Sequence, residues 1–144
     1  MIRVVLDANV VVSGVLSENG VPGRILKAWK AERFHLVTSA AILDELLRVL
    51  RYPKISRRHG WSQAEILEFV EDVARLAILV PGQHRLEVVA EDPTDDRYLE
   101  CAIEGGAAYI VSGDRHLVGL GQYKGVEILA PRGFLDLLRH ADAP

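Results

Sequence analysis

Short apolar, β-branched runs alternate along this chain with longer segments in which apolar residues recur about every three or four positions. The first pattern is typical of buried strands and the second of amphipathic helices. Residues 77–81 form one further short apolar run. The strand pattern occurs at residues 2–6, 34–39, 108–114 and 126–131.

Helices are predicted between these runs from apolar spacing and boundary residues. Pro22 suits a first helical position, and Pro53 is expected to end the helix that precedes it. Ser62 and Glu65 match a capping box, in which each side chain bonds the other residue's backbone N–H. The predicted helices span residues 22–31, 40–53, 61–77, 92–106 and 132–140.

Strands separated by helices predict an α/β fold, a three-layer α/β/α sandwich with a central parallel sheet. In such sheets, ligands bind outside the carboxyl ends of the strands. Asp7 and Asp114 each follow a predicted strand, so both are expected on that edge. This shared position is the first reason to consider the two aspartates together.

Composition indicates one ordinary globular domain, spanning residues 1–144. Of the 144 residues, 49% are hydrophobic and 26% are charged, and the formal net charge of −3 excludes a uniformly basic surface. Cys101 is the single cysteine, which excludes a disulfide within the chain and fits a reducing compartment. The apolar N-terminus is interrupted by Asp7 and Asn9 and is too short to span a membrane. A soluble, cytoplasmic protein with no membrane partner is expected.

Four acidic residues lie near predicted strand ends or helix starts, namely Asp7, Glu45, Asp96 and Asp114. Mg²⁺ and Mn²⁺ prefer oxygen ligands, and a divalent ion relieves the repulsion among clustered carboxylates. Taken singly, each acid has a simpler interpretation. Asp7 and Asp114 suit turns or caps, Asp96 suits the positive end of a helix dipole, and a solvated helix face accommodates Glu45. Their joint placement favours a metal site.

Four stretches, in this order, resemble the PIN-domain family: LDANVVVSG, ILDELLRVL, DPTDDRYLECAIEGGAAYIVSGD and VEILAPRGFLDLL. They are most similar to its branch of toxin components of toxin–antitoxin systems, the VapC-like ribonucleases. The resemblance covers nearly the whole chain. It implies the same α/β/α sandwich, cleavage of RNA, and Mg²⁺ or Mn²⁺ as the cofactor.

The resemblance also implies roles for individual residues. The four family acids that hold metal and carry catalysis correspond to Asp7, Glu45, Asp96 and Asp114. Asn9 matches a polar residue beside the first acid, and Ser112 matches a family serine or threonine. Asp95 is an alternative to Asp96, which is preferred because its spacing to Asp114 resembles that of the family.

Basic residues gather in the stretch RVLRYPKISRRHGW, where Tyr52, His59 and Trp61 are interleaved with them. Such a mixture suits contacts with an RNA backbone and stacking on bases. A solvated helix end followed by a loop explains the same charges equally well. The candidate RNA-binding residues are Arg48, Arg51, Lys54, Arg57, Arg58 and Arg115.

The leading hypothesis is a metal-dependent endoribonuclease that hydrolyses RNA phosphodiester bonds, as the toxin of a toxin–antitoxin pair. Water is the expected nucleophile, because no Ser–His–Asp order is evident and Cys101 lies mid-helix among apolar residues. The alternatives are a catalytically inactive PIN-like module that binds RNA or protein, and another α/β metal phosphohydrolase. The resemblance implies a small antitoxin as partner and a homodimer or higher homo-oligomer.

Overall fold

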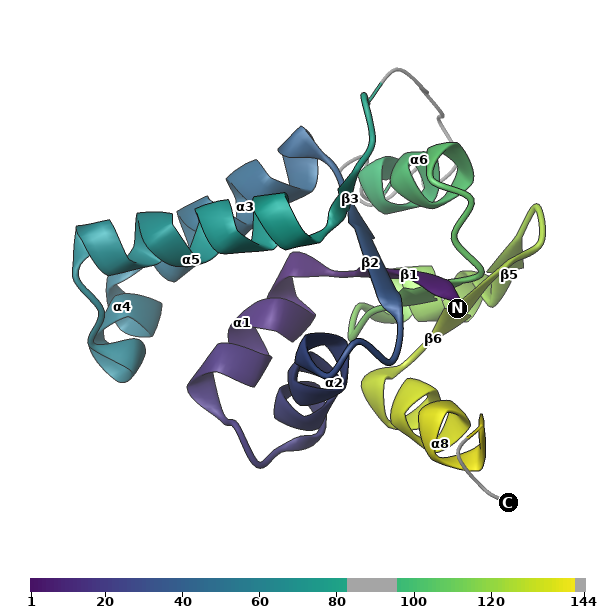
Figure 1. The fold of residues 1–144 in the computed structure, drawn as a ribbon, viewed down its shortest axis with the longest axis horizontal. Coiled ribbons are helices and arrows are strands. Elements are labelled where there is room, and N and C mark those ends of the chain that lie inside the picture. The colour runs from purple at the N-terminus through teal and green to yellow at the C-terminus, as the bar shows by residue number, and fades with distance from the viewer. Residues whose placement is uncertain (83–95, 142–144) are drawn as a thin grey trace.

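The computed structural model describes residues 1–82 and 96–141, and in these ranges six strands form one sheet (Figure 1). The strands are β1 (Arg3–Leu6), β2 (His35–Thr38), β3 (Ile78–Leu79), β4 (Tyr109–Val111), β5 (Gln122–Tyr123) and β6 (Val126–Leu129). Their order across the sheet is β3-β2-β1-β4-β6-β5. The neighbouring strands from β3 to β6 are parallel, which confirms the predicted architecture.

The edge strand β5 departs from the predicted parallel sheet. It pairs antiparallel with β6 across a two-residue turn. The turn residues Lys124 and Gly125 have φ of +47° and +85°, and a tight hairpin turn with two positive φ values matches the twist of the strands. The sequence did not predict β5, because a two-residue strand carries almost no pattern.

Helices flank the sheet on both faces. In the described ranges they are α1 (Ala8–Leu16), α2 (Val21–Lys30), α3 (Ala40–Leu50), α4 (Pro53–His59), α5 (Gln63–Leu76), α6 (Asp96–Glu104), α7 (Arg115–Leu120) and α8 (Pro131–Ala141). Within these ranges, no helix has the length and apolar character needed to cross a membrane. The capping box is confirmed, since Ser62 and Glu65 each accept the other's backbone N–H, at 3.0 and 3.1 Å.

Two apolar clusters form the core, one on each face of the sheet. Val4 and Leu6 of β1 point to the cluster that contains α1, α2, α5 and α8. Val5, between them in the sequence, joins the cluster of α6 and α7. Helix α3 contributes Leu46 to the first cluster and Ile42 to the second. Strand β1 is therefore covered on both faces, as its unbroken apolar sequence predicted.

Helix α1 follows β1 directly, and the hydrophobic pattern did not predict it. Its run Val10–Val12 has low helix propensity and high strand propensity. These valines are nevertheless buried. At Gly14, an added Cβ would lie 2.5 Å from Leu26 Cδ1 in α2, so a larger residue would have to displace that side chain. Packing against α2 and α3 therefore overrides the local preference for a strand.

Helices α3, α4 and α5 form an arm, residues 40–76, in which α3 and α5 lie side by side with α4 at the far end (Figure 1). A helix does end ahead of Pro53, as predicted, but it ends at Leu50, and Pro53 itself begins α4. Proline lacks an N–H that the first helical position does not need. The interpretation of this stretch as a helix end followed by a loop is corrected in the same way.

Candidate active site

Asp7 and Ser112 lie directly after two neighbouring parallel strands. β1 ends at Leu6 and β4 at Val111, and these two residues are paired across the sheet. From β1 the strand order continues outward through β2 to β3, whereas β4, β6 and β5 lie on the other side. The order therefore reverses between β1 and β4. In open α/β sheets, the crevice outside the carboxyl ends of the strands at such a reversal is the usual ligand site.

Asp7 is a buried carboxylate with hydrogen bonds to both oxygens. It is 4% exposed, Oδ1 accepts the backbone N–H of Asn9 at 2.9 Å, and Oδ2 accepts the hydroxyl of Ser112 at 2.7 Å. In the part of the chain that the structure describes, no Lys or Arg forms an ion pair with Asp7. Asp7 is therefore the N-cap of α1, one of the interpretations left open by the sequence. Each oxygen keeps a lone pair for a further ligand.

Ser112 connects the two strand-end aspartates. It is fully buried, and its hydroxyl donates to Asp7 while accepting the backbone N–H of Asp114 at 3.0 Å. Asp114 caps α7, where its Oδ1 accepts the N–H of His116 at 2.7 Å and of Leu117 at 3.4 Å. Asn9 supports Asp7 through its backbone alone, and its side chain is exposed.

Glu45 is held by a residue that the sequence did not single out. The Tyr98 hydroxyl donates to Glu45 Oε2 at 2.5 Å and accepts the backbone N–H of Ala8 at 3.3 Å. Burial raises the pKa of Tyr98 far above its ordinary value, and the charge of Asp7 and the hydrogen bond to Glu45 act in the same direction. Tyr98 is therefore a neutral donor. The sequence did hold a signal for this role, namely a tyrosine on the apolar face of a helix. A tyrosine hydroxyl that is buried usually has a hydrogen-bond partner.

Asp96 is the first residue of α6 and is 5% exposed. The turn after α6 leads to the amino end of β4, where Ala108 N–H bonds the carbonyl of Arg3. The start of α6 therefore faces the carboxyl edge, as predicted. Asp95, the alternative to Asp96, lies outside the described residues.

The oxygen-only chemistry of these side chains fits a hard divalent cation. Among the described residues, no three His, Cys, Asp or Glu side chains already gather into a metal site. Mg²⁺ needs no such cluster, because it keeps several waters and binds directly through one or two carboxylates. The buried Asp7 accepts the Ser112 hydroxyl at 2.7 Å, and the half-buried Asp114 donates its backbone N–H to the same hydroxyl at 3.0 Å, so the two residues supply carboxylates after neighbouring strands.

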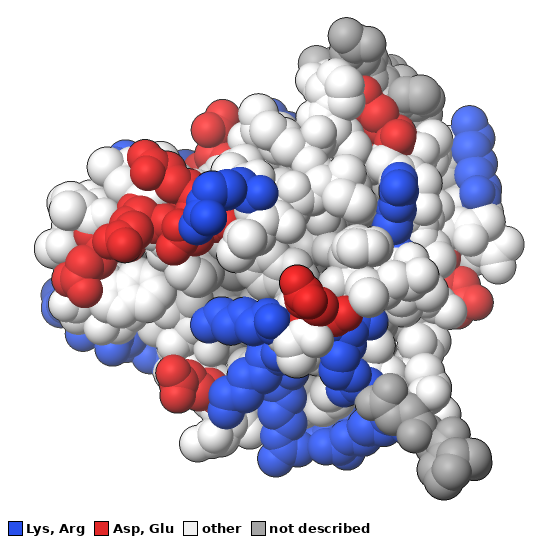
Figure 2. Space-filling view, in the orientation of Figure 1, with Lys and Arg blue, Asp and Glu red and all other residues white. Residues whose placement is uncertain are grey.

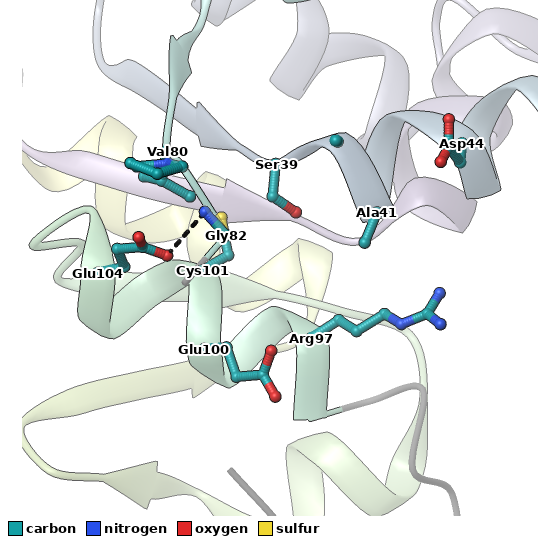
Figure 3. Close-up of a pocket in the computed structure, with 11 residues that line it drawn as sticks. Ser39, Ala41, Asp44, Val80, Gly82, Arg97, Glu100, Cys101 and Glu104 are labelled. Carbon is teal, nitrogen blue, oxygen red and sulfur yellow. Dashed lines mark hydrogen bonds between the residues drawn. The ribbon is translucent and has the colours of Figure 1, made fainter. Parts of the chain in front are cut away.

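A cavity of about 530 Å³ lies beside this edge, between the start of α3 and one face of α6 (Figure 3). Ser39, Asp44 and Arg97 are among the residues around it, and the backbone N–H of Gly82 donates to Glu104 there at 3.1 Å. The described residues that line it include none of the four predicted acids. The cavity is therefore a neighbour of the acidic edge and not the acidic edge itself.

Cys101 borders the same cavity but is 2% exposed. Burial raises the pKa of its thiol to about 12, so it stays protonated at neutral pH. A protonated thiol is a poor nucleophile. The prediction that Cys101 is a core residue is confirmed.

The predicted RNA-binding residues are exposed, on the arm and at the start of α7. Arg48 lies three residues after Glu45 in α3, on the same side of the helix and one turn further along. Arg51 is engaged by Gln63, whose Oε1 accepts its Nε–H at 3.1 Å. Arg115 follows Asp114 directly. The exposed residues of this set are Arg48, Arg51, Lys54, Arg57, Arg58 and Arg115.

The expectation that His59 and Trp61 serve base stacking is corrected by their contacts. The backbone N–H of Trp61 donates to His59 Nδ1 at 2.9 Å, so the other ring nitrogen, Nε2, donates to the carbonyl of Leu50, also at 2.9 Å. The Trp61 ring packs on Phe69 at 5.3 Å between centroids. Both side chains are half-buried and join the arm together. Tyr52 alone of the three aromatic residues is exposed, at 44%.

A second basic surface was not predicted. Figure 2 shows Lys and Arg gathered over α2 and α8, whereas acidic residues cover the outer side of α5. The α2 residues Arg24, Lys27 and Lys30 are exposed at a spacing of three, which aligns them along one side of the helix. Each residue alone looked like an ordinary surface charge, so only the packing of α2 beside α8 reveals the patch.

Two comparisons relate the sequence of this chain to known proteins. The sequence profile of the PIN domain matches residues 3–116. The uncharacterized protein MJ1680 of Methanocaldococcus jannaschii is 29% identical over 119 residues, which cover 83% of this chain and 75% of that protein. The matched range contains all four predicted acids, Asp7, Glu45, Asp96 and Asp114.

Proposed function

Because the chain belongs to the PIN domain family, whose members are generally nucleases, we propose that it is a cytoplasmic endoribonuclease that hydrolyses RNA phosphodiester bonds with Mg²⁺ or Mn²⁺. The observation that carries the proposal is the buried carboxylate of Asp7 between β1 and β4. In the described residues its bonding partners are a backbone N–H and a hydroxyl, and no cation. Burying a charge without a cationic partner is unfavourable, and a bound divalent ion would offset that cost.

In this proposal the four acids hold the ion, namely Asp7, Glu45, Asp96 and Asp114. The ion would polarise a phosphoryl oxygen and lower the pKa of an attacking water. Ser112 fixes the direction of the Asp7 carboxylate through its 2.7 Å hydrogen bond, and the N-terminus of α7 fixes Asp114. Water is the nucleophile, because the only thiol, that of Cys101, is buried and protonated.

RNA approaches along the arm in this proposal. Arg48 lies three residues after Glu45 on α3. The Lys and Arg residues of α4 continue the positive charge outward. Phosphate contacts from Lys and Arg supply most sequence-independent affinity for nucleic acids. Exposed Tyr52 is the side chain placed to stack on an unpaired base.

We also propose that the protein acts as a toxin, held inactive by a small antitoxin and assembled as a homodimer or higher homo-oligomer. This extension is supported by the resemblance of the motifs described above to the toxin branch of the family. The test is the product of a small reading frame next to the gene. An adjacent product that binds this chain and blocks cleavage supports the toxin role, and failure to inhibit contradicts it.

The nuclease proposal is tested by incubating the purified chain with a mixed RNA pool and Mn²⁺ and mapping the cut ends. We expect cleavage that EDTA abolishes. Asp7→Asn should lower the rate of RNA cleavage more than mutation of a residue that merely supports a metal ligand, which typically costs roughly 10–100-fold. Cleavage that persists in EDTA rejects the mechanism. RNA binding without any cleavage favours the alternative, an inactive PIN-like binding module.

A stability measurement separates loss of chemistry from loss of fold. Asparagine caps helices as well as aspartate does, and removing one carboxylate reduces repulsion among the acids. Asp7→Asn should therefore unfold in EDTA at the same or a higher denaturant concentration than wild type. Asp7→Ala lacks the cap and should lose about 0.5–2 kcal/mol. If Asp7→Asn unfolds as easily as Asp7→Ala, the role of Asp7 is structural.

The same assay decides between the two adjacent aspartates of the third motif. Asp96→Asn should abolish cleavage while RNA binding survives or improves, because a negative charge near phosphate is removed. Asp95→Asn is the matched control and should retain cleavage. The opposite result assigns the metal-facing role to Asp95.

A further inference from the structure

Tyr98 joins three of the four elements at which the predicted acids lie, and only α7, which Asp114 caps, is outside this set. It lies in α6, two residues after Asp96, and is only 2% exposed. Its hydroxyl reaches Glu45 in α3 at 2.5 Å and the backbone N–H of Ala8, the residue after Asp7, at 3.3 Å. One atom therefore ties α3, α6 and the start of α1 together.

The direction of these two hydrogen bonds follows from the groups involved. A backbone N–H can only donate and an ionised carboxylate can only accept. The single hydrogen of the Tyr98 hydroxyl therefore points to Oε2 of Glu45, and an oxygen lone pair receives the N–H of Ala8. The 2.5 Å separation lies at the short end of the range for a hydroxyl that donates to an ionised carboxylate. Among the described residues, no hydrogen bond reaches Oε1 of Glu45, which leaves this oxygen for another ligand.

Glu45 needs such a restraint more than Asp7 and Asp114 do. Asp7 and Asp114 are short side chains at strand ends and are fixed by capping bonds. Glu45 is longer, lies inside α3 and is half-buried, so its carboxylate has more rotamers to choose from. A side chain at a metal site is commonly fixed in this way by a hydrogen-bonded partner.

We propose that Tyr98 is a positioning residue of the nuclease site, which holds the Glu45 carboxylate in the orientation that metal binding and RNA cleavage require. The inference rests on the proposed function. Tyr98 acts through Glu45 and does not itself contact substrate. A role in packing alone would require only the ring, which phenylalanine supplies, so the hydroxyl is the group under test.

The experiment compares wild type with Tyr98→Phe in the full chain. We expect Tyr98→Phe to weaken Mn²⁺ binding without RNA, and to lower kcat, each by about 10–100-fold. The KM for RNA should stay the same, because the exposed Lys and Arg residues of the arm are unchanged. Tyr109→Phe removes a hydroxyl from the amino end of β4 and serves as the matched control, with wild-type values expected.

A double-mutant cycle shows whether the effect passes through Glu45. In the Glu45→Gln background, adding Tyr98→Phe should weaken Mn²⁺ binding no further, because the two residues act as a unit. An equal additional loss overturns the positioning role. NMR relaxation of the Glu45 side chain should show greater mobility in Tyr98→Phe than in Tyr109→Phe, and this readout needs neither metal nor activity.

The possible failures are distinguishable. A wild type that cleaves RNA, together with a Tyr98→Phe variant that matches it in Mn²⁺ affinity and kcat, overturns the role of Tyr98 alone. A wild type that neither binds Mn²⁺ nor cleaves RNA overturns the proposed function and the role of Tyr98 with it. A higher KM with unchanged kcat also contradicts the inference, because it indicates an effect on RNA binding.

Discussion

Ser112 shows how much one buried hydroxyl can organise at the scale of a residue. Ser112 has no exposed surface. Its hydroxyl donates to Asp7 and accepts from the backbone N–H of Asp114, so it acts as a donor and as an acceptor at once. Alanine would fill almost the same space but leave a buried carboxylate oxygen and a backbone N–H with one partner fewer. Leaving buried polar groups unsatisfied is more costly than the net gain from a typical hydrogen bond.

Cys101 gives a prediction about pH at the same scale. Burial raises the pKa of its thiol from 9.0 to about 12, and the charge of Glu104 acts in the same direction, against a hydrogen bond with Ser39. The unfolded chain therefore loses the thiol proton at lower pH than the folded chain. The contribution of Cys101 to stability is fully present below about pH 9 and declines up to about pH 12.

The measurement is denaturant unfolding of wild type and Cys101→Ala at neutral and alkaline pH. Relative to Cys101→Ala, wild type should lose on the order of 1 kcal/mol of unfolding free energy per pH unit over that alkaline range. The comparison cancels the other groups that titrate there. A difference between the two proteins that is independent of pH would contradict the shift.

At the scale of an element, α4 is a short helix with none of its residues fully buried. Its ends hold it in place. Gly60 ends the helix with φ of +70°, a left-handed conformation that glycine adopts without strain. His59 bonds the carbonyl of Leu50, where α3 ends, and the N–H of Trp61, which leads into α5. One imidazole thus connects the three helices of the arm at its far end.

Replacing that imidazole should loosen the arm. His59→Ala removes two hydrogen bonds and the ring contact with Trp61, and should lower the unfolding free energy by about 1–3 kcal/mol. Amide hydrogen exchange should accelerate first in α4. Arg58→Ala, an exposed neighbour in the same helix, should change stability by no more than about 0.5 kcal/mol. Equal stabilities of the two variants would show that the imidazole does not hold the arm.

At the scale of the whole molecule, charge is segregated although the net charge is only −3. The α2–α8 surface is basic, and the outer side of α5, which is part of the arm, is acidic (Figure 2). Five of the six predicted RNA-binding residues lie elsewhere on the arm, along α3 and α4. A polyanion therefore meets two basic surfaces. The arm is preferred because Arg48 shares α3 with Glu45, whereas α2 carries none of the four predicted acids.

RNA binding at increasing salt tests this preference. Arg57→Ala with Arg58→Ala should weaken binding and flatten the log–log salt dependence by up to about one unit per lost phosphate contact. Arg24→Ala with Lys27→Ala removes the same charge from α2 and should leave the slope close to that of wild type. A larger effect of the α2 pair would place RNA on the α2–α8 surface.

The sequence alone determined the features that depend on neighbours along the chain. The capping box of Ser62 and Glu65 joins residues three apart, and the amphipathic spacing of α3 and α5 is visible in any short window. Alternation of strands and helices was enough to predict a parallel sheet, and hence that Asp7 and Asp114 would follow strands at one edge. Three of the four family motifs lie within residues 3–116, the range that the PIN-domain profile matches, and they were readable for the same reason.

Only the tertiary structure decided which distant residues meet. The bond between Tyr98 and Glu45 spans 53 positions and that between Ser112 and Asp7 spans 105, so each exists only because separate elements pack together. Helix α1 forms despite its valines, because α2 and α3 bury it. The strand order that puts β1 beside β4 was likewise outside any local pattern. Local hydrogen bonds and periodicity are properties of a segment, whereas these contacts depend on the free energy of the whole core.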